Sequence, residues 1–132
     1  MADEIFFDTN ILLYTLEPRD PRYEKAVRLV DDGGVISVQV LNEFVNSAWK
    51  KFRFPYIKSA EFLLAFKETL RVVSLTPAIH ERALEIALTN GIGIYDANII
   101  AAAELSDCDV LYTEDLNNGQ RIGRVTICNP FV

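Results

Sequence analysis

The stretch EIFFDTNILLY, residues 4–14, places one aspartate between two apolar runs. Ile5–Phe7 has the apolar and aromatic composition of a buried strand, so Asp8 falls at the end of that strand. A buried carboxylate without a partner is costly, so Asp8 must accept hydrogen bonds, pair with a cation or bind a metal ion. The position of Asp8 raises the question of which other groups reach the same strand end.

The composition indicates one globular domain that spans residues 1–132. Half of the residues are apolar and about a quarter are charged, which is typical of folded rather than disordered chains. A net charge of −6 argues against nucleic-acid binding through bulk electrostatics. It does not exclude a nuclease, because bound divalent cations can invert the local field. The two cysteines, Cys108 and Cys128, lack the spacing of a zinc site and are expected to be reduced thiols.

No apolar run approaches the length of about 18 residues that a transmembrane helix needs, so no membrane association is expected. The N-terminal stretch MADEIFF is acidic where a secretory signal would be basic. We therefore expect a cytoplasmic protein.

Short apolar runs along the chain predict the fold class. Most are continuous rather than alternating, which is typical of parallel strands covered on both faces. The expected strands are Ile5–Asp8, Val35–Val38, Val72–Leu75, Val110–Thr113 and Val125–Cys128. Helical patterns lie between them, which predicts a doubly wound α/β domain.

The helical patterns have recognisable starts and ends. Asp20-Pro21 predicts the start of a helix that ends at Gly33-Gly34. The next pattern has a predicted apolar stripe of Leu41, Phe44, Val45, Ala48, Trp49 and Phe52. Further helices are expected over 56–70, from Thr76-Pro77 to Asn90-Gly91, and from residue 95 to 105.

In doubly wound sheets, the functional site lies beyond the carboxyl ends of the strands. Four acids from separate segments meet this condition: Asp8, Glu43, Asp96 and Asp115. Each also has a purely structural explanation: a strand-end acid, a solvated helix face, a helix cap and a turn residue, respectively. Their shared predicted position at one edge of the sheet is a stronger signal than any one of them.

Carboxylates that lie close together repel one another unless some are protonated or cations neutralise them. Oxygen ligands of this kind suit Mg²⁺ or Mn²⁺. A bound ion of this type can activate water and stabilise charge on phosphorus, so the pattern predicts metal-assisted phosphodiester hydrolysis. No histidine base is required, which suits a chain whose single histidine is His80.

The blocks FFDTNILLY, LNEF, YDANIIAAA and LYTEDLNNGQ resemble, in order and approximate spacing, the acidic blocks of PIN-domain ribonucleases. The resemblance covers nearly the whole chain and is greatest to the VapC-type toxins of bacterial toxin–antitoxin pairs, down to the final NPF. It implies a three-layer α/β/α fold with a five-stranded parallel sheet of order 3-2-1-4-5. It also implies that the four acids form the family's catalytic site for Mg²⁺ or Mn²⁺, with Asn10 ordering the first loop and Thr113 in a hydroxyl position.

The same resemblance implies the partners of the protein. They are an RNA substrate, a second copy in a homodimer, and a cognate antitoxin that inserts a segment near the acidic site. DNA would be contacted only indirectly, through the antitoxin.

Two other functions are alternatives to the metal-dependent endoribonuclease. A phosphate-accepting receiver domain fits poorly, because its third strand should end in an acid and this one ends VVSLTP. A non-catalytic PIN-like module that binds nucleic acid or protein stays open. Two local alternatives also stay open. The stretch WKKFRFPY, residues 49–56, either contacts RNA or ends an amphipathic helix, and FLLAF belongs either to the core or to a groove for the antitoxin.

Overall fold

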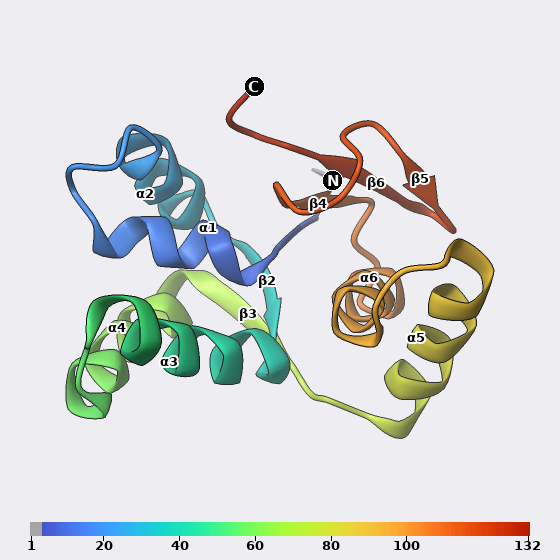
Figure 1. The fold of residues 1–132 in the computed structure, drawn as a ribbon, viewed down its shortest axis with the longest axis horizontal. Coiled ribbons are helices and arrows are strands. Elements are labelled where there is room, and N and C mark those ends of the chain that lie inside the picture. Colours follow the sequence, from blue (N-terminus) through green and yellow to red (C-terminus); the bar gives the residue numbers. More distant parts are fainter. Residues whose placement is uncertain (1–3) are drawn as a thin grey trace.

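A computed structural model describes residues 4–132, so the first three residues of the acidic N-terminal stretch lie outside the described part. A single sheet runs through the middle of the molecule, with helices on both of its faces (Figure 1). The predicted three-layer α/β/α class is confirmed.

The strands are β1 (Ile5–Phe7), β2 (Gly34–Ser37), β3 (Leu70–Val73), β4 (Val110–Tyr112), β5 (Arg121–Ile122) and β6 (Val125–Cys128). Their order is β3-β2-β1-β4-β6-β5. The five longer strands pair in parallel, in the order that the resemblance implied. The predicted number of strands was wrong, because β5 pairs antiparallel with β6 as a sixth strand at the edge of the sheet. The two residues of β5 are too few to form a recognisable hydrophobic pattern in the sequence.

The third strand also starts two residues earlier than predicted. Leu70 is buried and belongs to β3, whereas Leu75, which we placed in the strand, is half exposed after it. The apolar run continued beyond the paired segment, so hydropathy alone misplaced the end of the strand.

On one face of the sheet lie α1 (Thr9–Leu13), the short 3-10 helix Tyr14–Leu16, α2 (Tyr23–Asp31), α3 (Val38–Phe52) and α4 (Tyr56–Thr69). On the other lie α5 (Pro77–Asn90) and α6 (Ile94–Leu105), as Figure 1 shows. Small side chains let α6 pack closely, because Ala97 and Ala101–Ala103 are completely buried. The FLLAF run is divided: Phe66 is buried in the core and Leu64 is exposed.

Two helix predictions need correction. The helix expected from Asp20-Pro21 begins at Tyr23, because the Asp20 carboxylate instead accepts a hydrogen bond from the backbone N–H of Arg22 in the preceding turn (2.8 Å). The apolar stripe of α3 was also too wide, since Trp49 is 42% exposed and Phe52 38% exposed.

Within residues 4–132, no single helix is long and apolar enough to cross a membrane; α5 and α6 reach that length and composition only as a pair bent by 120°. The apolar residues of α6 belong to the core, because six of them are buried. The carboxyl ends of the parallel strands all point to one edge of the sheet, and the N-termini of α1, α3 and α6 lie at this edge. This edge positions the candidate site.

Candidate active site

Asp8 links β1 to α1 and is almost completely buried, with 7% of its surface exposed. It is the N-cap residue of α1, with the extended backbone that this position requires. One carboxylate oxygen accepts a hydrogen bond from the backbone N–H of Thr9, and the other accepts one from the hydroxyl of Thr113, both at 2.7 Å. The strand-end cap that we considered as an alternative is therefore present, but it leaves the charge of Asp8 unpaired.

Burial raises the pKa of Asp8 to about 6, against the lowering effect of its two hydrogen bonds. The charges of Asp115 and Glu43 raise this pKa further. Among the ion pairs of the described residues, none involves any of the four predicted site acids. Of the three ways expected to satisfy a buried Asp8, the structure shows hydrogen bonds and no cation, so its charge stays without a neutralising partner.

Glu43 lies in the second turn of α3 and is held by two side chains. The hydroxyl of Thr9 donates to its Oε1 at 2.6 Å, and the amide of Gln39 donates to its Oε2 at 3.3 Å. The Gln39 amide also donates to the backbone carbonyl of Tyr95 at 3.1 Å, which joins α3 to α6. Glu43 therefore does not lie on a freely solvated helix face. Sequence reasoning did not assign Thr9 or Gln39 to the site, although Thr9 lies within the first block and Gln39 lies just before the second.

Asp115 stands in the loop after β4 and is more exposed than Asp8. Its Oδ2 accepts a hydrogen bond from the side-chain amide of Asn10 at 3.0 Å. Its backbone N–H donates to the hydroxyl of Thr113 at 3.1 Å, and that same hydroxyl donates to Asp8. Asn10 and Thr113 thus connect the first and fourth segments of the site.

Asp96 lies in the first turn of α6 and is partly buried. It is not the cap of that helix, because Gly93 occupies the N-cap position without a side-chain hydrogen bond. Burial raises the pKa of Asp96, and the charge of Asp115 raises it further. The structure therefore brings Asp96 within electrostatic range of Asp115, as Asp8 is of Glu43 and Asp115.

We refer to Asp8, Glu43, Asp96 and Asp115 as the acidic pocket. Across residues 4–132, no three acidic, histidine or cysteine side chains lie close enough together to chelate one metal ion as they stand. Mg²⁺ does not require such a cage, because it binds through one or two carboxylates and fills the remaining positions with water and substrate phosphate. Oxygen ligands, a buried unpaired carboxylate and mutual repulsion all fit a divalent cation of this kind.

A polar network borders the acidic pocket and was missed in the sequence. Arg22 holds Asp20 through two of its nitrogens, at 2.9 and 2.8 Å, and also donates to Tyr14 at 2.9 Å and Glu114 at 3.0 Å. The Tyr14 hydroxyl donates to Glu114, and Arg22 stacks over the Tyr14 ring. The network anchors the residue that precedes Asp115. Tyr14 lies in an apolar run, so the local sequence did not identify it as part of a polar network.

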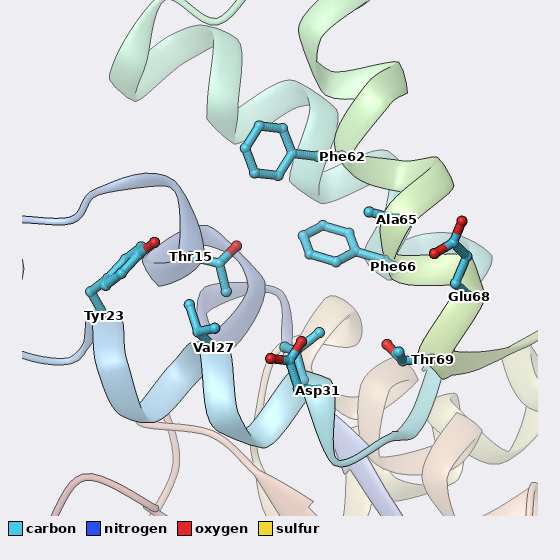
Figure 2. Close-up of a pocket in the computed structure, with 10 residues that line it drawn as sticks. Thr15, Tyr23, Val27, Asp31, Phe62, Ala65, Phe66, Glu68 and Thr69 are labelled. Carbon is cyan, nitrogen blue, oxygen red and sulfur yellow. The ribbon is translucent and has the colours of Figure 1, made fainter.

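A separate hollow lies between α2 and α4 (Figure 2). Val27, Phe62 and Phe66 supply apolar walls, and the carboxylates of Asp31 and Glu68 stand at one end. The two phenylalanines of the FLLAF run therefore serve both the core and this hollow. Its lining contains none of the acidic-pocket residues, so the hollow is separate from the candidate chemistry.

The family model of the PIN domain matches residues 5–123 of the chain. No curated protein sequence matches the chain.

Several solved structures share the fold. VapC20 of Mycobacterium tuberculosis, a toxin that cleaves the sarcin-ricin loop, has a TM-score of 0.70 and 19% identity over 85% of this chain and 90% of its own. A toxin–antitoxin complex from Klebsiella pneumoniae has a TM-score of 0.70 and 24% identity, with 93% and 96% covered. DNA-bound VapBC from Salmonella typhimurium has a TM-score of 0.69 and 21% identity, with 96% and 97% covered. At these identities the likeness shows the fold.

Proposed function

The chain belongs to the PIN-domain family, and we propose that it is a Mg²⁺- or Mn²⁺-dependent endoribonuclease that acts as the toxin of a toxin–antitoxin pair. The observation that carries this proposal is the burial of Asp8 without a cationic partner, within electrostatic range of Glu43 and Asp115. Asp8 caps α1, but a neutral side chain could do the same, and the buried unpaired charge does not itself stabilise the fold. A divalent cation bound against a substrate phosphate would neutralise it.

The residues of the acidic pocket have separable roles in this proposal. Asp8 and Asp96 would hold the metal directly, since the pKa of each is raised by burial and by a neighbouring charge. Glu43 and Asp115 would complete the ligand shell directly or through water. When bound, the ion supplies an activated water and stabilises negative charge on the phosphate.

The supporting hydrogen bonds keep these carboxylates in position before RNA arrives. Thr113 donates to Asp8 and accepts from the backbone of Asp115, so one hydroxyl fixes the spacing of two acids. Asn10 orients Asp115, and Thr9 orients Glu43. Carboxylates fixed in this way need little rearrangement to meet a metal ion, which favours binding. Loss of Asn10 or Thr113 should therefore weaken metal affinity without removing a ligand.

The partners proposed for this chain follow from its relatives. Toxin–antitoxin complexes, one of them bound to DNA, share its fold. We propose a cytoplasmic homodimer whose cognate antitoxin inhibits cleavage and carries the only contact with DNA. The hollow between α2 and α4 suits an antitoxin segment with an apolar side chain and a neighbouring cation, because its walls are apolar and Asp31 and Glu68 stand at its end (Figure 2).

The test is incubation of the purified protein with total RNA in Mg²⁺, in Mn²⁺ and in EDTA. We expect cleavage with either metal, with 5′-phosphate and 3′-hydroxyl ends, and none in EDTA. Asp8→Asn should abolish cleavage while the protein stays folded by circular dichroism. Cleavage that persists in EDTA, or in Asp8→Asn, would contradict the proposal. RNA binding without cleavage by the wild-type protein would favour the non-catalytic module instead.

A further inference from the structure

A second feature of the surface stands out against the acidic composition of the chain. No aspartate or glutamate lies between Glu43 and Glu61, although the chain has 19 acids. Four of its 13 lysines and arginines fall within this gap. They are Lys50, Lys51, Arg53 and Lys58. These residues occupy the end of α3, the connection to α4 and the first turn of α4, and we call residues 49–58 the basic corner.

The cations of the basic corner form no ion pair among residues 4–132, although Arg53 and Lys58 lie over the rings of Trp49 and Phe54 at 5.5 and 5.3 Å. In the part of the chain that the structure describes, the arginines that form ion pairs are Arg22, Arg71, Arg82 and Arg124, all outside the corner. All four corner cations are exposed. A cluster of unpaired positive charge on a protein of net charge −6 favours a polyanionic ligand.

The corner also presents aromatic rings to solvent. Trp49 is 42% exposed and Tyr56 65% exposed, although both are large side chains that a core would normally cover. Their ring centroids lie 6.3 Å apart, and together with Pro55 they line a small hollow. The Arg53 guanidinium lies 5.5 Å from the centre of the Trp49 ring. Exposed rings beside cations are the combination that binds single-stranded nucleic acid, through base stacking and phosphate contacts.

One face of α3 joins the basic corner to the acidic pocket. Glu43 and Lys50 are seven residues apart, so they lie on the same face of the helix, about 10 Å apart along its axis. Asn46 and Ser47 stand between them on this face, and Asn46 is exposed. Figure 1 shows that α3 extends from the end of β2 to the α3–α4 connection without interruption. A strand bound at the pocket can therefore continue along a polar path to the corner.

We propose that this face of α3 and the basic corner hold the single-stranded part of the RNA substrate, with Lys50 and Lys51 on its phosphates and a base stacked on Trp49. The inference rests on the proposed ribonuclease function and extends it, because it assigns named residues outside the acidic pocket to the substrate strand and gives the direction of that strand away from the pocket. It also explains how an acidic protein retains RNA: the attraction comes from one corner rather than from net charge.

The test measures binding of a fluorescent single-stranded oligonucleotide across a salt titration, by anisotropy in Mn²⁺. Every variant carries Asp8→Asn so that the RNA stays intact. Lys50→Ala/Lys51→Ala should make the slope of log affinity against log salt less steep by about 1.4, because each single-strand phosphate contact contributes about 0.7. Affinity near physiological salt should fall about tenfold.

Trp49→Ala separates stacking from charge. It should weaken binding about tenfold and leave the salt slope unchanged, and Trp49→Phe should restore most of the affinity. The matched control is Lys25→Ala/Arg28→Ala, which removes two exposed cations from α2 without touching the corner. This control should change neither the slope nor the affinity by more than about twofold.

An unchanged salt slope in Lys50→Ala/Lys51→Ala would overturn the inference, as would an equal change in the α2 control. A shift of oligomeric state in the corner variants, measured by light scattering, would assign the corner to a subunit interface and also overturn it. These failures are distinct from failure of the proposed function, which would appear as absent metal-dependent cleavage by the wild-type protein.

Discussion

Carboxylates are used in two opposite ways in this protein, and the difference separates the acidic pocket from the rest of the surface. Burial and neighbouring negative charges raise the pKa of Asp8 to about 6. The hydrogen-bonded guanidinium of Arg22 lowers the pKa of Asp20 to about 2. Similarly, Arg82 lowers the pKa of Glu104, whereas burial raises that of Asp96.

The positions of the arginines cause this difference between the pKa values of the two groups of carboxylates. Arg82 and Arg124 converge on Glu104, Asp107 and Asp109 around α6 and the β5–β6 turn. Arg22 pairs with Asp20 and Glu114 beside the pocket, and no arginine of residues 4–132 forms an ion pair with a pocket acid. The paired carboxylates stabilise the folded chain, and the unpaired ones keep a charge available for a ligand. The lack of a cation beside the pocket acids is therefore what supports their proposed part in the chemistry.

The largest effect that follows from this comparison is on catalysis. Asp96→Asn should lower RNA cleavage at saturating Mg²⁺ at least about a hundredfold, because it removes a proposed metal ligand. Glu104→Gln is the matched control: it also neutralises an acid of α6, but one that is paired with Arg82. It should leave kcat within about twofold. Equal losses in the two variants would erase the distinction between the two kinds of carboxylate.

Position beyond the strand ends was the criterion that selected the four candidate acids, Asp8, Glu43, Asp96 and Asp115, because parallel strands bring their carboxyl ends to one edge. The structure places Asp8 within electrostatic range of Glu43 and Asp115, and Asp96 within electrostatic range of Asp115. Their metal-binding role stays a prediction. The strand order came from the family resemblance, because the residue pattern alone leaves several orders open.

What sequence reasoning missed depends on contacts between distant residues. The Tyr14–Glu114 hydrogen bond joins residues 100 positions apart, and no local pattern encodes it. The predicted ends of some helices and strands were wrong for the same reason. Asp20-Pro21 has the form of a helix start, but the Arg22 side chain folds back onto Asp20 and delays the helix. Local sequence propensity was enough to predict the helices and strands, but contacts between side chains determine where they begin and end.

The second prediction concerns stability without metal. The folded-state pKa of Asp8, about 6, lies above its ordinary value of 3.8, so ionisation opposes folding. The stability that the neutral carboxyl provides is complete below pH 4 and is lost as pH rises through 6. In EDTA, Asp8→Asn should therefore be more stable than the wild type by about 2 kcal/mol at pH 7.5, after allowance for a weakened hydrogen bond.

The measurement is urea unfolding of both proteins at pH 4.5 and 7.5. Comparing the variant with the wild type at each pH removes the opposite contributions of Asp20 and Glu104, whose lowered pKa values favour folding at higher pH. The advantage of Asp8→Asn should largely disappear at pH 4.5. An advantage of the same size at both pH values would mean that the charge of Asp8 does not oppose folding.

The third prediction tests a paired carboxylate in the same way. Arg82 donates to Glu104 at 2.5 Å, and the side chain of Glu104 is only 15% exposed. Arg82→Met should destabilise the protein by about 1–2 kcal/mol at pH 7.5, because Glu104 is left charged without its main partner. Unfolding of Arg82→Met/Glu104→Gln supplies the control. The double variant should recover part of the loss, and a purely additive result would show that the pair is not coupled.

The smallest effect is expected at the boundary between the two regions, where Tyr14 and Arg22 both contact Glu114. Tyr14→Phe removes one hydroxyl but leaves the ion pair between Arg22 and Glu114 at 3.0 Å. Unfolding should therefore cost about 0.5–1 kcal/mol less free energy than in the wild type. Because that ion pair still anchors the loop that carries Asp115, Mn²⁺ affinity measured by calorimetry should change less than about threefold. A tenfold loss of Mn²⁺ affinity with little change in stability would contradict this separation, since the paired network would then position a pocket carboxylate as well as stabilise the fold.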